Sequence, residues 1–261
     1  MMSTTYQNKL ALVTGASSGI GEWFARHLAQ QGADLILVAR RADRLEQLKQ
    51  ELASTGRTIH VMAMDLLTPD APQKLWQQTQ AAGLQVDVLI NNAGFGKHGS
   101  FLEIALEQHR DMLGLNVSAL TELTWLFAQD MKQRGSGKIL LVASIAAYLP
   151  VPEFSTYAAS KAYVLSFGQA LHSELKPFGV DVTVLSPGGV ATEFMEVSGQ
   201  NFDDWRSFAI MKPEKVGAMA LKALAKARRV IVPGLLYSIS MASLRLIPNR
   251  LQLTIGRMTT Q

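Results

Sequence analysis

Cysteine is absent from the 261-residue sequence, and the five histidines are scattered along it. Without thiols the chain forms neither disulfide bonds nor thiolate metal sites, and no two histidines have the spacing of metal ligands on one helical face. Charged residues make up only 18% of the chain, and the net charge of +4 comes from dispersed lysines and arginines rather than from a basic run. We therefore expect no bound metal and no nucleic-acid partner.

Long hydrophobic runs are missing as well. A membrane span needs ~18 uninterrupted apolar residues, and the nearest candidate, Gly234 to Ile247, is broken by Arg245 and followed by Pro248. The first apolar run, Leu10–Val13, leads directly into a glycine turn and lacks the basic start and apolar core of a secretory signal. We expect a cytoplasmic protein with no membrane span.

The chain does contain enough apolar residues, 48% of the total, to fill one large core. Short aliphatic runs alternate with amphipathic segments of helical length such as Glu22–Gln31, and no repeat or linker interrupts them. We predict an α/β fold of one domain, 1–261, with a doubly wound, mainly parallel seven-stranded sheet and helices on both faces. The predicted strands are Leu10–Val13, Leu35–Ala39, Ile59–Ala63, Val86–Ile90, Ile139–Ala143, Val180–Leu185 and Val230–Val232.

A glycine-rich turn, Thr14–Gly21 (TGASSGIG), follows the first predicted strand and opens a helix. Backbone N–H groups and the helix dipole at such a junction hold a pyrophosphate, and small residues let the backbone approach it. The spacing G-x-x-x-G-x-G differs from the common dinucleotide fingerprint G-x-G-x-x-G, so the comparison rests on mechanism. A plain strand-to-helix turn is the alternative.

The end of the second predicted strand indicates which dinucleotide binds. An acid about 20 residues past the glycines would bond the ribose hydroxyls of NAD, but the sequence there is Ala39-Arg40-Arg41. A guanidinium donates paired hydrogen bonds to phosphate, so we assign Arg40 to the ribose 2′-phosphate and expect NADP(H) as the cofactor. The alternative, a solvated residue leading into the helix Ala42–Ala53, is favoured for Arg41.

Several motifs in one order resemble the short-chain dehydrogenase/reductase family: TGASSGIG, then Asn91-Asn92-Ala93-Gly94, then Ser144, then Tyr157 with Lys161 four residues later. The likeness covers residues 8 to 192, and the Arg40 pattern and apolar C-terminus are similar to the ketoacyl and hydroxysteroid reductase branch. The resemblance implies a Rossmann-like fold and hydride transfer between a nicotinamide and a carbonyl or alcohol carbon.

Carried over residue by residue, the resemblance implies a cofactor site along the carboxyl ends of the strands. Asp65 would accept a hydrogen bond from the adenine amino group, or alternatively it caps the helix near Asp70. Asn91 or Asn92 alternatively ties neighbouring strands together. The implied cofactor residues are Gly15, Ser17, Ser18, Gly19, Ile20, Gly21, Arg40, Asp65, Leu66, Asn92, Ala93, Gly94, Tyr157, Lys161, Pro187, Gly188, Val190 and Thr192.

Tyr157 and Lys161 lie four residues apart in a segment, 155–176, of helical character, so both side chains emerge on one face. A phenol has a pKa of ~10 in water, and an adjacent ammonium lowers it towards the range useful for proton transfer. Tyr157 is therefore the expected general acid in reduction and the general base in oxidation.

The resemblance assigns further roles around this tyrosine. It implies that Lys161 also holds the nicotinamide ribose and that Ser144 bonds the substrate oxygen. It further implies that Asn116 supports a water leading to Lys161. Taken singly, Ser144 and Asn116 are alternatively caps, and Tyr157 and Lys161 are surface residues of a helix.

The stretch from Pro187 to Lys212 is the only long irregular segment, and we predict a substrate lid at about 188–212. Its start, Pro187–Thr192, resembles the family's nicotinamide loop, in which Val190 and Thr192 would contact the carboxamide. The lid and the loop past Ser144 predict an apolar cleft wall, although rings in a lid alternatively pack it onto the body. These wall residues are Phe194, Met195, Phe202, Trp205, Phe208, Met211, Tyr148, Leu149, Val151, Pro152 and Phe154.

An apolar helical extension follows the last predicted strand, at about 234–257. One face of it holds Leu235, Leu236, Ile239, Ala242, Leu246 and Ile247. Arg245, Arg250 and Arg257 follow or flank this face. We expect a partner subunit of a homo-oligomer, or the protein's own body, to cover it; peripheral membrane contact is the alternative.

Together these features predict NADP(H)-dependent reduction of an apolar ketone or 3-oxoacyl substrate. The alternatives are a hydroxysteroid or secondary-alcohol dehydrogenase working in the opposite direction, and a non-catalytic protein that senses NADP. The presence of Ser144, Tyr157 and Lys161 argues against a sensor.

Overall fold

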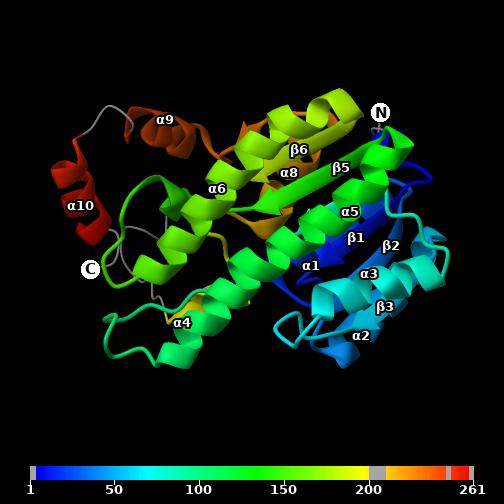
Figure 1. Ribbon diagram of the computed structural model, residues 1–261, viewed down its shortest axis with the longest axis horizontal. Coiled ribbons are helices and arrows are strands. Elements are labelled where there is room, and N and C mark those ends of the chain that lie inside the picture. The colour runs from blue at the N-terminus through cyan, green and yellow to red at the C-terminus, as the bar shows by residue number, and fades with distance from the viewer. Residues whose placement is uncertain (1–3, 200–209, 245–247, 259–261) are drawn as a thin grey trace.

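The computed structural model describes residues 4–199, 210–244 and 248–258. At its centre lies one seven-stranded parallel sheet in the order β3-β2-β1-β4-β5-β6-β7, which confirms the predicted doubly wound architecture (Figure 1). The strands are β1 (Leu10–Thr14), β2 (Asp34–Ala39), β3 (Ile59–Ala63), β4 (Val88–Asn91), β5 (Gly137–Val142), β6 (Val180–Leu185) and β7 (Val230–Ile231).

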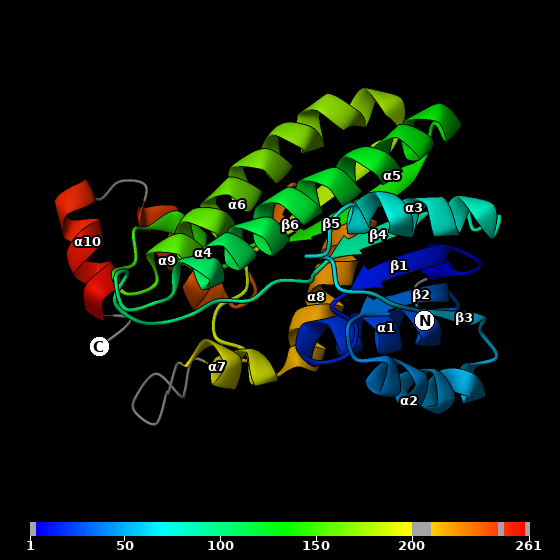
Figure 2. The same ribbon diagram turned by 60° about the horizontal axis from the view of Figure 1, so that its bottom comes forward.

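Helices cover both faces of the sheet (Figure 2). One face carries α1 (Gly19–Gln30), α2 (Ala42–Leu52) and α8 (Pro213–Ala225); the other carries α3 (Ala71–Ala81), α5 (Leu120–Arg134) and α6 (Ser155–Leu175), with α4 (Leu106–Leu113) packed beside α6. The shorter helices are η1 (Thr4–Tyr6), η2 (Ala53–Thr55), η3 (Gly114–Ala119), η4 (Ile145–Tyr148), η5 (Lys176–Phe178), α7 (Glu193–Ser198), α9 (Leu235–Leu244) and α10 (Asn249–Met258). None of the described helices is long and apolar enough to cross a membrane.

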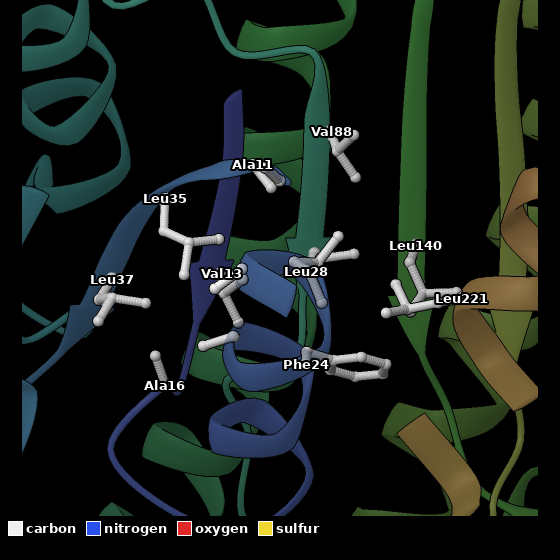
Figure 3. Close-up of a cluster of buried hydrophobic side chains, with 14 of the residues drawn as sticks. Ala11, Val13, Ala16, Phe24, Leu28, Leu35, Leu37, Val88, Leu140 and Leu221 are labelled. Carbon is white, nitrogen blue, oxygen red and sulfur yellow. The ribbon is translucent and has the colours of Figure 1, made fainter. Parts of the chain in front are cut away.

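The central strands are apolar on both faces because helices cover both. In β1, Leu12 belongs to the apolar cluster beneath α3, α5 and α6, whereas Val13 belongs to the cluster beneath α1 and α8, and both are fully buried. Figure 3 shows Val13 beside Phe24 and Leu28 of α1. Continuous apolar runs are what such a sheet requires, so these runs were sufficient to predict all seven strands.

The strand boundaries depart from the predicted ones by one or two residues, except at β3 and β6, which have the predicted ends. The largest shifts, of two residues, lie at the starts of β4, which begins at Val88 rather than Val86, and of β5, which begins at Gly137 rather than Ile139; the one at β4 has a local cause. Just before β4, the Asp87 carboxylate accepts the Leu10 N–H at 3.0 Å. The first amide of β1 is therefore bonded by a side chain. Such local side-chain bonds are invisible to apolar patterning.

The sheet reverses its direction of winding at the centre, because β1 pairs with both β2 and β4. At such a reversal the connections leave the carboxyl ends of two adjacent strands towards opposite faces, and ligands of open α/β sheets bind there. Helix α6 lies close against the neighbouring strands, because a Cβ at Gly168 would collide with Val184 of β6. The helix that carries Tyr157 is thereby fixed near this edge.

Candidate active site

The turn after β1 leaves no room for side chains at its glycines. Gly15 and Gly19 have φ of +65° and +60°, a backbone region that suits glycine. A Cβ at Gly15 would lie 2.8 Å from Asn92 Nδ2, and one at Gly21 would collide with the Gly15 carbonyl. Helix α1 begins at Gly19, and the side chain of Ser18 does not cap its first amides. The turn thus presents bare backbone amides at the positive end of a helix, which fits a pyrophosphate.

Thr14 and Asn92 fasten this turn to the end of β4. The Thr14 hydroxyl accepts the N–H groups of Asn92 and Ala93, both at 3.0 Å, and donates to the Ile90 carbonyl at 3.2 Å. The Asn92 amide donates to the carbonyls of Thr14 and Gly15 at 3.0 and 3.3 Å. The alternative that Asn92 ties neighbouring strands is confirmed. Thr14 was not among the predicted site residues, and its place directly before the glycine turn was the available signal.

Arg40 and Arg41 occupy different positions at the end of β2. Arg41 stands at the start of α2, as predicted, but it is more than a solvated residue. Its guanidinium donates to the Ser17 hydroxyl at 3.2 Å and pairs with Glu193 of α7 at 2.9 Å, which lowers the pKa of Glu193. Arg40 is exposed and makes no hydrogen bond or ion pair with any residue that the structure describes. Its guanidinium is therefore available to a ligand.

Asp65 and Leu66 form the turn after β3. Asp65 Oδ1 accepts the Leu67 N–H at 3.0 Å, and Asp70 rather than Asp65 stands at the N-cap of α3. The alternative that Asp65 caps this helix is therefore wrong. Leu66 is buried in the apolar cluster on the same side of the sheet as α3. Contact of either residue with an adenine stays a prediction.

Ser144, Tyr157 and Lys161 meet at the carboxyl end of β5. The Ser144 hydroxyl caps η4 by accepting the Ala146 N–H at 3.1 Å, and it also shares a hydrogen bond with Tyr157. Lys161 Nζ lies 5.7 Å from the centroid of the Tyr157 ring and donates to the Val142 carbonyl at 2.9 Å. The prediction that Tyr157 and Lys161 lie on one face of a helix is confirmed. Both side chains are buried, so the alternative that they are surface residues is wrong.

Burial controls the titration of this pair. Desolvation raises the pKa of Tyr157 to about 12, although the hydrogen bond from Ser144 lowers it in part. Desolvation lowers the pKa of Lys161 to about 8. The pKa of the phenol therefore lies above its ordinary value, whereas the sequence predicted a lowered one, because desolvation is the largest cause of the shift. A phenol with this pKa is protonated at neutral pH and is a proton donor.

Asn116 lies in η3, a π-helical segment that joins α4 to α5, a feature often found at functional sites. Its buried amide accepts the Phe95 N–H at 3.1 Å and donates to the Phe95 carbonyl at 2.9 Å and to Ser160 Oγ at 3.0 Å. A Cβ at Gly94 would lie 2.7 Å from Asn116 Oδ1 and 3.3 Å from Lys161 Nζ, so both groups border the same glycine. The water that Asn116 would support stays a prediction.

Aromatic rings enclose the Tyr157 phenol. Phe154 stacks on it with ring centroids 4.3 Å apart, and the ring of Phe194 from α7 lies at 5.5 Å. A Cβ at Gly96, which was not predicted for the site, would lie 2.6 Å from Phe154 and 2.9 Å from Tyr157. These contacts also fit the alternative in which the rings pack the lid onto the body, so the apolar substrate wall stays a prediction. Of the lid residues singled out from the sequence, Phe202, Trp205 and Phe208 lie outside the described residues.

The segment after β6 borders the site from the other side. Ile145, which follows Ser144, donates its N–H to the Pro187 carbonyl at 2.9 Å. Thr192 lies beside the glycine turn, because a Cβ at Gly19 would be 3.1 Å from its side chain. Pro187 and Thr192 therefore link the serine to the turn. Their contacts, and those of Gly188 and Val190, with a nicotinamide stay predictions.

Comparison with known proteins agrees with this geometry. The family model described as short chain dehydrogenase matches residues 9–202. The chain belongs to the short-chain dehydrogenase family. It is 34% identical over 230 residues to a ketoacyl reductase of Nostoc sp., covering 88% of this chain and 80% of that protein. It is 31% identical over 198 residues to the human very-long-chain 3-oxoacyl-CoA reductase, covering 74% of this chain and 63% of the reductase.

A solved relative extends the comparison to three dimensions. A short-chain dehydrogenase from Sphingobium yanoikuyae, in complex with NADPH, has a TM-score of 0.83 and 30% identity, covering 91% of this chain and 92% of that one. The present chain, by contrast, spans less than two thirds of the length of several curated relatives, such as the human reductase. The predicted family and enzyme class are confirmed: the protein is an oxidoreductase acting on hydroxyl or carbonyl groups.

The buried lysine makes the stability of the fold depend on pH. The pKa of Lys161 falls from 10.5 to about 8 on folding, so between these values the unfolded chain binds the proton and the folded chain does not. Stability therefore rises with pH in this window. We expect the unfolding free energy of the wild type, minus that of Lys161→Met, to increase by on the order of 2–3 kcal/mol from pH 7.5 to 10 in urea titrations. A flat difference would show that the Val142 carbonyl keeps the lysine charged.

Proposed function

We propose that this chain is an NADP(H)-dependent reductase of apolar ketones or 3-oxoacyl groups. The observation that carries the proposal is the buried group of Ser144, Tyr157 and Lys161, in which a protonated phenol bonds the serine beneath two aromatic rings. Such a group donates a proton to a carbonyl oxygen in a site that excludes water. The cytoplasmic location stays a prediction from the sequence.

The residues present fit a dinucleotide. The glycine turn, Gly15–Gly21, offers bare amides to the pyrophosphate, and the available guanidinium of Arg40 suits the 2′-phosphate. The backbone of 92–94 borders the turn on the adenosine side, and Lys161 with the loop 187–192 would hold the nicotinamide end. When bound, NADPH supplies a hydride to the carbonyl carbon.

Tyr157 then supplies the proton. Its pKa of about 12 keeps the phenol protonated at neutral pH, and Ser144, which shares its hydrogen bond, holds the same carbonyl oxygen. Lys161, with a pKa of about 8, carries a positive charge at neutral pH and stabilises the phenolate left after proton transfer. Asn116 borders Lys161 and supports the water through which the proton is replaced.

The wall around Tyr157 supports an apolar substrate, because Phe154 and Phe194 flank the phenol and Val151 packs in the same cluster. The names of the two relatives above, a ketoacyl reductase and a 3-oxoacyl-CoA reductase, indicate the same class of substrate. Alcohol oxidation is the second candidate, and it needs Tyr157 as a base. The raised pKa of the phenol means that it is protonated at neutral pH, which is the state that reduction starts from.

Replacing Tyr157 by Phe tests the proton donor. The ring stays and only the hydroxyl is lost, so we expect kcat for an aryl ketone or a 3-oxoacyl thioester to fall by roughly 10²- to 10⁴-fold. The Kd for NADPH, measured by fluorescence titration, should stay within about twofold. Tyr163→Phe on the same helix is the matched control and should turn over normally. Turnover by Tyr157→Phe within tenfold of the wild type would remove the assignment.

Replacing Arg40 tests the choice of cofactor. Arg40→Leu deletes a charge-assisted bond of ~1.5–3 kcal/mol, which weakens NADPH by roughly 10- to 150-fold and leaves NADH unchanged. Adding Ala39→Asp supplies an acceptor for the ribose hydroxyls and repels the phosphate. The ratio of kcat/KM for the two cofactors, at fixed low salt, is the measurement. Arg41→Leu is the control: it removes the contacts with Ser17 and Glu193 and should change both cofactors alike.

A homo-oligomer is the proposed assembly, and an apolar patch on α5 and α6 supports it. Trp125 is 62% exposed, and Thr121, one helical turn away, bonds Tyr163 of α6 at 2.9 Å. Tyr163 in turn stacks on Phe167. A two-fold interface would bury this patch against its own copy.

Light scattering tests the assembly. The wild type should have a mass that is a multiple of 28.5 kDa, and Trp125→Glu should lower that mass. Leu102→Glu, at another exposed position, should leave the mass unchanged. A monomeric wild type would contradict the proposal.

A further inference from the structure

Helix α9 turns one aromatic side chain onto the loop that follows β6. A Cβ at Gly188 would lie 2.5 Å from Cζ and 3.0 Å from the hydroxyl oxygen of Tyr237, so the tyrosine ring covers this glycine. The Tyr237 hydroxyl also faces the backbone N–H of Gly189, which partly offsets the rise in the pKa of Tyr237 that burial causes. One side chain of the C-terminal extension thus contacts two consecutive residues of the loop.

The ring belongs to the inward face of α9. Tyr237, Met241 and Leu244 recur at helical spacing, and Met241 and Leu244 are buried. Leu235 and Leu236 lie on the face expected to be covered, yet they are 79% and 82% exposed in the monomer. The extension is therefore attached to the body through the face that the apolar pattern did not single out.

Other elements hold the same loop from its remaining sides. Met211 donates its N–H to the Gly189 carbonyl at 2.9 Å, and Ile145 of η4 donates to the Pro187 carbonyl at 2.9 Å. Helix α9 also packs against η4, the helix that Ser144 caps. The two glycines are therefore enclosed by the segment at Met211, by η4 and by Tyr237.

We propose that Tyr237 is a positioning residue that holds Gly188 and Gly189 in the conformation that receives the nicotinamide, so that α9 completes the cofactor site. Glycine loses more conformational freedom on ordering than any other residue, and two in succession make a loop costly to fix. A ring packed on one and a hydroxyl facing the amide of the other fix them before the cofactor binds, which strengthens binding. The inference rests on the proposed function, because it takes this loop to be the nicotinamide loop.

Tyr237→Phe tests the hydroxyl, with Leu236→Ala, an exposed neighbour on the same helix, as the matched control. In the cofactor-free protein, hydrogen exchange of the Gly189 amide should become at least tenfold faster in Tyr237→Phe and stay unchanged in the control. The Kd for NADPH should rise three- to tenfold in Tyr237→Phe, with the melting temperature and kcat at saturating NADPH close to those of the wild type. The control should bind within twofold.

Gly188→Ala tests the ring. The added methyl meets Tyr237, so NADPH binding should weaken more than tenfold, and Gly188→Ala combined with Tyr237→Ala should bind more tightly than Gly188→Ala alone because the space is restored. Equal weakening by Gly188→Ala with and without the ring, or unchanged exchange and affinity in Tyr237→Phe, would overturn the inference. A wild type that binds neither NADPH nor NADH would instead overturn the proposed function.

Discussion

The site depends first on the connection between the ends of β1 and β4. The Thr14 hydroxyl accepts two N–H groups from the start of the segment after β4, and the Asn92 amide returns two hydrogen bonds to the carbonyls of Thr14 and Gly15. These bonds set the position of the glycine turn, hence where α1 begins. Strands β1 and β4 are already paired as far as Val13 and Ile90, and these side-chain bonds extend the connection from the sheet into the turn.

A second constraint is the desolvation of the residues to which the proposal assigns the proton transfer. The rings of Phe154 and Phe194 and the close packing of α6 remove water from Tyr157 and Lys161, and this raises one pKa and lowers the other. Both shifts disfavour the charged forms. In the proposed reaction, a phenol and an ammonium placed together in a dry pocket would interact strongly once a charge develops on the phenolic oxygen.

The sequence was informative wherever a local pattern determines the outcome. The apolar runs predicted the strands, the glycine turn predicted the junction of β1 and α1, and the four-residue spacing placed Tyr157 and Lys161 on one face. It was uninformative where the outcome depends on packing between distant segments. It did not predict the contact of Arg41 with Glu193, and it predicted the wrong direction for the pKa shift of the Tyr157 phenol. Each of these follows from three-dimensional neighbours that no window of the sequence contains.

The C-terminal extension shows what an apolar pattern leaves undetermined. Its most apolar face is expected to be covered by a partner subunit or by the protein's own body, whereas the attachment seen in one chain uses Tyr237, whose hydroxyl faces a backbone amide. An apolar face fixes how strongly a helix avoids water but not where it docks, because apolar contact has no direction. A hydrogen bond to one particular amide does have direction. The helix is therefore positioned by its tyrosine, and Leu235 and Leu236 remain exposed as a surface on which other contacts can be made.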